Sequence, residues 1–473
     1  MAFDLLLENA SVVTPDGVQR DVAIGVREGT IAATGSTESL DDGDRVVDLE
    51  GQYLFPGIID CHVHTRSPGY EYKEDWSTAS AAAAAGGVTT ILAMPNTDPM
   101  IDSPETLEQV FDIADRDAYV DFQSYAVLTS DNYDQAIPLA EAGAAGFKVF
   151  LGTTFGEIEP PTDGELYDAM GDIAEAGKRV GFHEENDEIL SHMERKFKEE
   201  GRNRPIDHAQ SRPVVAEAEA VSRIILLAHH ADCPVHMFHL SSGTGAELVA
   251  DGKRRGVNVS AETTPHYLWF TEEVMEEKGN AARVQPPIRT VDEREKLWDV
   301  GVNGHGVDCF ATDHAPHTDE EKGLEDPFRN TWESISGFVG SETQVPAMYT
   351  FVADGRLSLS QWAYMHSTRP AQLWGLYPQK GSFQVGTDAD FTVIDPNTEW
   401  ELNRETLHSK SKATPFDGER FVGKPSMTVV RGSIVYDGDD LQVETGYGER
   451  VPSGDTTSDP RPRPFDAQRE QNE

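Results

Sequence analysis

Histidines and one aspartate recur in this chain at the ends of short apolar segments. His62 and His64 stand in DCHVH, and later segments end with His183 in GFHEEN, His239 in MFHLSSG and Asp313 in ATDHAPH. If DCHVH ends a strand, side chains two residues apart point to the same face. Imidazole and carboxylate ligands without thiolates suit zinc, and a catalytic site keeps one position open for water. The pattern therefore predicts a metal centre.

A single lysine, Lys148, interrupts the apolar segment GFKVFLG. A buried ammonium is costly, and burial favours the neutral amine. A neutral amine can add CO2 and become a carbamate, whose two oxygens could bridge two metal ions about 3.5 to 4 Å apart. The alternative is that Lys148 reaches out of the strand to an acidic partner such as Glu157 or Glu184. The spacing by itself leaves both interpretations open.

The other histidines of the chain are less suited to bind a metal. His236 lies three residues before His239, so it should face the other way and sit deeper. His229 and His230 close a predicted helix, and His208 stands in a loop with no strand behind it. His266, in PHYL, is expected to pack or to form hydrogen bonds. We assign these residues to the structure or to the surface.

Eight strand-and-helix units are predicted to position the candidate ligands. The strand candidates are GIIDCHVH, GVTTILAMP, YVDFQSYAVLT, AGFKVFLG, RVGFHEE, CPVHMFHLSS, VNVSAETTPHYL and VDCFATDHAPH. Their number and spacing predict an α/β fold, a (β/α)8 TIM-like barrel over residues 56–376, with its active site at the C-terminal ends of the strands. Alternating short strands in residues 1–55 and 377–445 predict one small β-sandwich domain. Residues 446–473 are polar and rich in proline, and we expect them to be disordered or to lie on a neighbour.

Composition excludes several classes of partner. Lys and Arg number 39 against 83 Asp and Glu among 473 residues, a net charge of −44, which disfavours nucleic acid and anionic membranes. We expect a halophilic protein that gains activity and stability in molar KCl, where charge repulsion is screened. The three cysteines, Cys61, Cys233 and Cys309, indicate neither a disulfide framework nor a cysteine-based zinc site. With no signal peptide or membrane span recognisable near the N-terminus, we expect a cytoplasmic protein.

Longer motifs resemble those of a known family. DCHVHTRSPG, AAAAAGGVTTILAMPNTDP and FATDHAPHTDEEK resemble, in order, three signatures of dihydroorotases, which are cyclic amidohydrolases of the amidohydrolase superfamily. GFKVFLGTTFGE is similar to the animal-type subgroup, in which the lysine is carbamylated. The resemblance implies two zinc ions per subunit, one held by His62, His64, Asp313 and an N6-carboxylated Lys148, and the other by Lys148, His183 and His239.

The same resemblance assigns further roles around the metal centre. It implies that Arg66, Asn96 and His317 bind a substrate carboxylate, and that Asp313 transfers protons. Gln285 and Gly337 are expected near the substrate, although both lie in segments that depart from the usual family pattern. Thr154 and Phe155 match a mobile loop that closes over the substrate.

The resemblance also implies an activity. We expect a dihydroorotase, which reversibly hydrolyses the cyclic amide of dihydroorotate to N-carbamoyl-aspartate in de novo pyrimidine biosynthesis, as a homodimer or homotetramer. One alternative is a hydantoinase, dihydropyrimidinase or allantoinase that acts on another cyclic ureide. A second is a non-catalytic scaffold on the same fold, which would typically have lost metal ligands.

Overall fold

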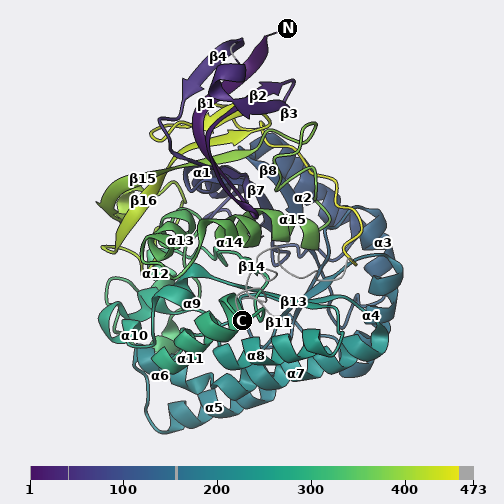
Figure 1. Ribbon diagram of the computed structural model, residues 1–473. Helices are drawn as coiled ribbons and strands as arrows, with labels where there is room; N and C mark the ends of the chain where they lie inside the picture. Colours follow the sequence, from purple (N-terminus) through teal and green to yellow (C-terminus); the bar gives the residue numbers. More distant parts are fainter. Residues whose placement is uncertain (1, 41, 155–157, 458–473) are drawn as a thin grey trace.

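The computed structural model describes residues 2–40, 42–154 and 158–457, and its larger part is a barrel of parallel strands (Figure 1). β8 and β9 are separated by Tyr125 alone and together form one of the eight barrel positions. The barrel closes between β6 and the segment after β14, where the His64 backbone N–H donates to the His314 carbonyl over 2.8 Å. All eight predicted strands are present, and the predicted fold class is confirmed. The barrel strands are β6 (Ile58–Val63), β7 (Val88–Ala93), β8 (Asp121–Ser124), β9 (Ala126–Val127), β10 (Phe147–Phe150), β11 (Val180–His183), β12 (Val235–Met237), β13 (Val259–Thr263) and β14 (Cys309–Phe310).

Helices surround the barrel and follow each of its strands (Figure 1). Local sequence explains where several begin: Asp75 caps α1 and Ser103 caps α2, each accepting from a backbone N–H in the first turn. The helices after the first four strands are α1 (Trp76–Ala85), α2 (Pro104–Asp117), α3 (Ala136–Glu141) and α4 (Asp163–Glu175). Those after the later strands are α5 (Asp187–Glu199), α6 (Pro205–Ser211), α7 (Val214–Ala231), α8 (Gly243–Arg254), α9 (Pro265–Trp269), α10 (Val274–Glu277), α11 (Val291–Lys296), α12 (Asp319–Lys322), α13 (Gln344–Ala353), α14 (Leu359–Ala363) and α15 (Arg369–Leu373).

Strand alternation decides which side chains enter the barrel. In β10, Phe147 and Val149 belong to the apolar core between the strands and the outer helices, while Lys148 between them points to the barrel interior. In β6 the pairing register with β7 shifts between Asp60 and Val63. This irregularity lies where Cys61 packs in the lower barrel interior and His62 lines the cavity above it.

The two ends of the chain build one eight-stranded sheet beside the barrel, at the top of Figure 1. β5 joins the two ends, because it pairs in parallel with β1 and antiparallel with β15. Apolar side chains of both chain segments, among them Leu7, Ile24, Leu54, Phe391 and Val429, form a separate core for this sheet. Its strands are β1 (Phe3–Thr14), β2 (Gly17–Arg27), β3 (Thr30–Ser36), β4 (Gly43–Asp48), β5 (Tyr53–Pro56), β15 (Phe391–Glu401), β16 (Arg420–Val430) and β17 (Ser433–Tyr436).

The polar segment that follows this sheet, which we expect to be disordered or to lie on a neighbour, is described as far as residue 457. Residues 446–457 run along the barrel: the Val451 backbone N–H donates to the Phe122 carbonyl over 2.9 Å, and the Lys178 ammonium donates to the Ser453 carbonyl over 3.0 Å. Val451 is 5% exposed. Hydrogen bonds to its backbone and one buried apolar side chain thus hold this polar segment on the barrel. Among the described residues, no helix has the length and apolar character needed to cross a membrane.

Candidate active site

A cavity at the C-terminal ends of the barrel strands collects most of the predicted site residues. This is the position expected for an active site in such a barrel. The described residues that line it are His62, His64, Arg66, Asn96, Lys148, Phe150, Thr154, His183, His239, Val284, Gln285, Asp313, Ala315, Ser336 and Gly337.

Three ligand-type side chains converge on one side of the cavity. The Nε2 atoms of His62 and His64 each lie 3.3 Å from Oδ1 of Asp313, and candidate ligand atoms of the three residues lie within 4.8 Å of one another. All three side chains are buried. The cluster therefore presents three candidate donor atoms to a single point, as a metal ion requires.

The hydrogen bonds behind the two histidines set the direction of their lone pairs. His62 Nδ1 lies 2.5 Å from Oε1 of Glu262, and His64 Nδ1 lies 2.6 Å from Oδ1 of Asn96. Both partners are acceptors, so each histidine carries its proton on Nδ1 and directs the lone pair of Nε2 toward Asp313. The two nitrogen lone pairs and the carboxylate oxygen that they face repel one another unless a cation or a proton lies between them. The residues present therefore fit a metal ion.

A second pair of histidines lies next to this cluster. Nδ1 of His183 and Nε2 of His239 face each other across 3.0 Å, and the ring centroids of His62 and His239 are 5.1 Å apart. His183 Nε2 lies 2.9 Å from a carboxylate oxygen of Glu185, which leaves the lone pair of His183 on Nδ1, on the cavity side. The site thus has two neighbouring groups of nitrogen donors.

Burial keeps the histidines of this site neutral. It lowers the pKa of His62, His64 and His239 well below the ordinary value, and the nearby charges of Lys148 and Arg66 add to this effect. A neutral imidazole is the form that binds a metal. Burial also raises the pKa of Asp313 to about 7, against the opposing effect of Lys148 and other positive groups.

Lys148 lines the same cavity as the two groups, and its Nζ has no hydrogen-bond partner among the described residues. Nζ is fully buried and stands 4.0 Å from the ring centroid of Phe238 and 4.9 Å from that of Phe150. Burial lowers its pKa to about 8. The alternative partner Glu184 forms no hydrogen bond to Nζ, and Glu157 lies outside the described residues. A buried amine with a lowered pKa and no hydrogen-bond partner among the described residues fits a lysine that is modified to a carbamate.

The residues expected to bind substrate divide into those that line the cavity and those that do not. Arg66, Asn96 and Gln285 line it, as does Thr154 at its rim. Phe155 lies outside the described residues. Gly337 also lines the cavity with φ of 119°, and a Cβ there would stand 2.7 Å from the Ala315 carbonyl oxygen, so only glycine fits.

His317 is not among the described residues that line the cavity, and its contact with a substrate stays a prediction. It lies behind Arg66, with Nε2 3.1 Å from a guanidinium nitrogen of Arg66 and Nδ1 3.1 Å from the Lys73 ammonium. The resemblance predicted that His317 and Arg66 lie close together, but it did not predict which of them lines the cavity. His317 therefore supports the arginine rather than the cavity surface.

The remaining histidines largely follow the predicted division. His236 is buried below the cavity against Ser260 and Glu262, and His229 and His230 are exposed in the last turn of α7. His266 packs edge-on against Phe338. The placement of His208 in a loop is wrong: it is a buried residue of α6, 6.4 Å from the ring of Trp332. The proline at the start of this short helix, Pro205, was a signal for it.

Sequence reasoning missed the charged residues that hold the histidines from behind. Glu262 contacts His62, and Glu185 contacts His183 while accepting a hydrogen bond from Arg212 Nε over 3.1 Å. A signal existed, because Glu262 interrupts the apolar segment VNVSAET as Lys148 interrupts its own strand.

Three residues of the site also share an unusual backbone. Arg66, His239 and Asp313 have φ values of 60°, 35° and 49°, in the left-handed region that non-glycine residues rarely adopt. Each follows a barrel strand, so the chain turns sharply at the strand end and directs the side chain toward the cavity. Such strained residues are concentrated at functional sites.

Comparisons with known proteins agree with this architecture. The profile described as the Amidohydrolase family matches residues 53–435. An L-hydantoinase of Paenarthrobacter aurescens is 32% identical over 95% of this chain and 98% of its own length, and an allantoinase of Deinococcus radiodurans is 35% identical over 92% and 96%.

Solved structures show the same likeness. The L-hydantoinase (dihydropyrimidinase) from Arthrobacter aurescens superposes with a TM-score of 0.92 at 32% identity, covering 95% of this chain and all of that one. A D-hydantoinase (dihydropyrimidinase) from Thermus sp. superposes with a TM-score of 0.87 at 28% identity, covering 96% of this chain and all of that one. The chain therefore belongs to the amidohydrolase family, within the group of cyclic-amide hydrolases that includes hydantoinases and allantoinases.

Proposed function

We propose that this protein hydrolyses a ring amide of a five-membered cyclic ureide, of the hydantoin or allantoin class, with a pair of zinc ions. The observation that carries the proposal is the convergence of His62, His64 and Asp313, whose candidate ligand atoms lie within 4.8 Å of one another. The full-length similarity to a hydantoinase and an allantoinase supports the substrate class, and it favours this class over dihydroorotate, our first expectation.

The proposed metal centre uses six residues of the cavity. His62, His64 and Asp313 would hold one ion, and His183 and His239 would hold the other. Lys148, after its neutral amine forms a carbon–nitrogen bond with CO2 and releases a proton, would offer one carbamate oxygen to each ion. When bound, such a pair of ions polarises a carbonyl group and lowers the pKa of water.

Asp313 is suited to move the proton in this reaction. Hydrolysis adds a hydroxyl group to the ring carbonyl carbon and a proton to the ring nitrogen as the bond between them breaks. A carboxylate whose pKa burial raises to about 7 can accept the proton of the attacking water and pass it to the departing nitrogen.

The cavity wall would orient the substrate. Asn96 and Gln285 offer hydrogen bonds to ring oxygens and nitrogens, and Gly337 lets the backbone approach the ring closely. Thr154 stands at the rim, where a closing loop would contact the substrate. Asn96 would serve twice, since its carbonyl oxygen already accepts from His64.

One observation favours a second candidate, dihydroorotate. Arg66 is 2% exposed and lines the cavity, and a buried guanidinium beside a substrate site suits a carboxylate. Hydantoin and allantoin carry no carboxylate, whereas dihydroorotate does. The two substrate classes therefore make opposite predictions about how much activity depends on Arg66.

A substrate panel tests the proposal. The purified protein, loaded with zinc in high KCl, is assayed with 5-substituted hydantoins, allantoin, dihydrouracil and dihydroorotate, and with N-carbamoyl-aspartate in the ring-closing direction. Turnover of hydantoins or allantoin is expected to dominate. Turnover confined to dihydroorotate and N-carbamoyl-aspartate would replace the ureide proposal with the second candidate. No turnover, together with no bound metal after careful purification, would support a non-catalytic scaffold.

A further inference from the structure

A buried carboxylate, Glu262 of β13, lies directly beneath the proposed metal centre. Its side chain is fully buried, and its two oxygens face different sets of partners. Oε1 lies 2.5 Å from His62 Nδ1 and 3.2 Å from the backbone nitrogen of His239. Oε2 lies 3.3 Å from the thiol of Cys61 and 3.3 Å from His236 Nε2.

The contacts of Oε1 matter because they reach both groups of candidate ligands. The bond to His62 keeps the proton of that ring on Nδ1, so the lone pair of Nε2 points toward Asp313. The bond from the His239 backbone N–H holds a residue whose φ of 35° is strained, and this backbone directs the His239 ring toward His183. One oxygen thus controls the ring proton of one candidate ligand and the backbone of another.

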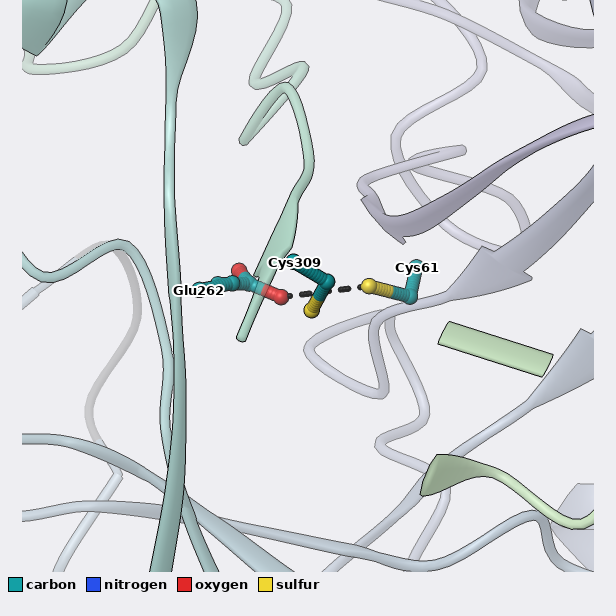
Figure 2. A group of neighbouring side chains, drawn as sticks. All are labelled: Cys61, Glu262 and Cys309. Carbon is teal, nitrogen blue, oxygen red and sulfur yellow. Dashed lines mark hydrogen bonds between the residues drawn. The ribbon is translucent and has the colours of Figure 1, made fainter. Parts of the chain in front are cut away.

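The contacts of Oε2 lead away from the centre. Figure 2 shows the Cys61 thiol and the Glu262 carboxylate pointing toward each other, with Cys309 beside them. The candidate ligand atoms of the three residues lie within 4.8 Å of one another, and all three residues are buried. Glu262 already accepts from His62, and Cys61 can donate to it as a neutral thiol, so the group is satisfied without a cation of its own. The Cys61 thiol instead helps to fix the orientation of the carboxylate from below, whereas Cys309 lies beside it.

We propose that Glu262 is a positioning residue shared by both halves of the metal centre, through its hydrogen bonds from His62 and from the backbone of His239. This inference rests on the metal centre of the proposed function. Glu262 lines no part of the cavity among the described residues, so it acts through the histidines. Glu185 provides the contrast, because its carboxylate reaches one candidate ligand, His183, and belongs to one half of the centre.

The test compares Glu262→Gln, Glu185→Gln and Cys309→Ser in the full-length protein. Zinc stoichiometry and dissociation constants are measured by competition with a chelator, which needs no substrate. Glu262→Gln is expected to weaken binding of both ions about 10- to 100-fold, because an amide is a weaker acceptor and fixes the ring proton less well. Glu185→Gln should weaken one ion, and Cys309→Ser neither. In kinetic assays Glu262→Gln should lower kcat with little change in KM.

Two results would overturn the proposal. The first is wild-type affinity for both ions in Glu262→Gln. The second is an equal loss of thermal stability in its metal-free and metal-loaded forms with unchanged zinc dissociation constants, which would assign Glu262 to the barrel core alone. If Glu262→Gln does not fold, Glu262→Asp is subjected to the same zinc titration. A wild-type protein that binds two zinc ions but turns over no cyclic ureide would refute the proposed substrate and leave this inference standing.

Discussion

Carbamylation of Lys148 should make assembly of the metal centre depend on CO2. Only the neutral amine reacts, and burial lowers the pKa of Lys148 to about 8. At pH 7 about one-tenth of such a lysine is neutral, against about 0.03% at its ordinary pKa, a gain of about 300-fold in reactive amine. The neutral fraction rises with pH. Because the folded-state pKa is lowered, this fraction levels off already above about pH 8.

The assay follows reconstitution of metal-free protein. Zinc is added with and without bicarbonate at several pH values, at a fixed concentration of dissolved CO2, and bound zinc and activity are followed in time. We expect reconstitution to require CO2 and to accelerate about tenfold per pH unit below pH 7 and about fivefold between pH 7 and pH 8. Carbon-13 bicarbonate should give a carbamate signal in the NMR spectrum that is absent from Lys148→Ala.

Several results would refute this reasoning. Full reconstitution at the same rate in CO2-free buffer would show that no carbamate is needed. A Lys148→Ala variant that retained two zinc ions and activity would show that the bridge is absent. The exposed Lys198, whose side chain is 47% exposed in an ion pair with Glu194, offers a matched control, since Lys198→Ala should reconstitute as the wild type does.

Three further predictions concern other parts of the protein. Arg66→Met should lower kcat/KM for carboxylated substrates about 10- to 100-fold, the value of a charge-assisted hydrogen bond, and should change kcat/KM for neutral ureides little. Arg420→Met, on a side chain that is 85% exposed, is the control. Equal losses on both substrate classes would contradict the role of Arg66. The melting temperature and activity should rise with KCl toward 2 M, because the Debye length falls to about 3 Å near 1 M, and no gain over an equal concentration of a neutral osmolyte would exclude a halophilic adaptation. The pKa of His408 is raised by its hydrogen bond to Glu342, so its contribution to stability is complete below pH 6.5 and is lost as pH rises through the folded-state pKa. Denaturation of the wild type and of His408→Gln at pH 6 and pH 9 should show a difference in unfolding free energy that shrinks as pH rises. A difference that stays constant would contradict this linkage.

The sequence alone predicted the barrel and most of the cavity lining, because both depend on short-range periodicity. Alternation along the strand places Lys148 on the barrel interior, while Phe147 and Val149 pack against the outer helices. His62 and His64, two residues apart, were also expected on one face, and both rings point toward Asp313. The candidate ligands therefore follow from local pattern and from their positions at strand ends.

The substrate class was less accessible to sequence motifs. The expectation of dihydroorotate rested on the joint presence of Arg66, Asn96 and His317. The structure places His317 behind Arg66 rather than in the cavity wall, and similarity over nearly the whole chain favours hydantoinases and allantoinases. A motif records which residues are near one another, whereas substrate choice depends on which of them reach the cavity surface.

What the sequence determined by itself is the set of elements and the residues able to bind metal; what only the tertiary structure decided is how those residues are oriented. His62 and Glu262 are 200 positions apart, yet their hydrogen bond decides which nitrogen of His62 carries a proton. Glu262 lies on a different strand from His62, so no local pattern can contain this pair. Lys148 likewise became interpretable once its buried amine was found in the same cavity as the histidines, without a hydrogen-bond partner among the described residues.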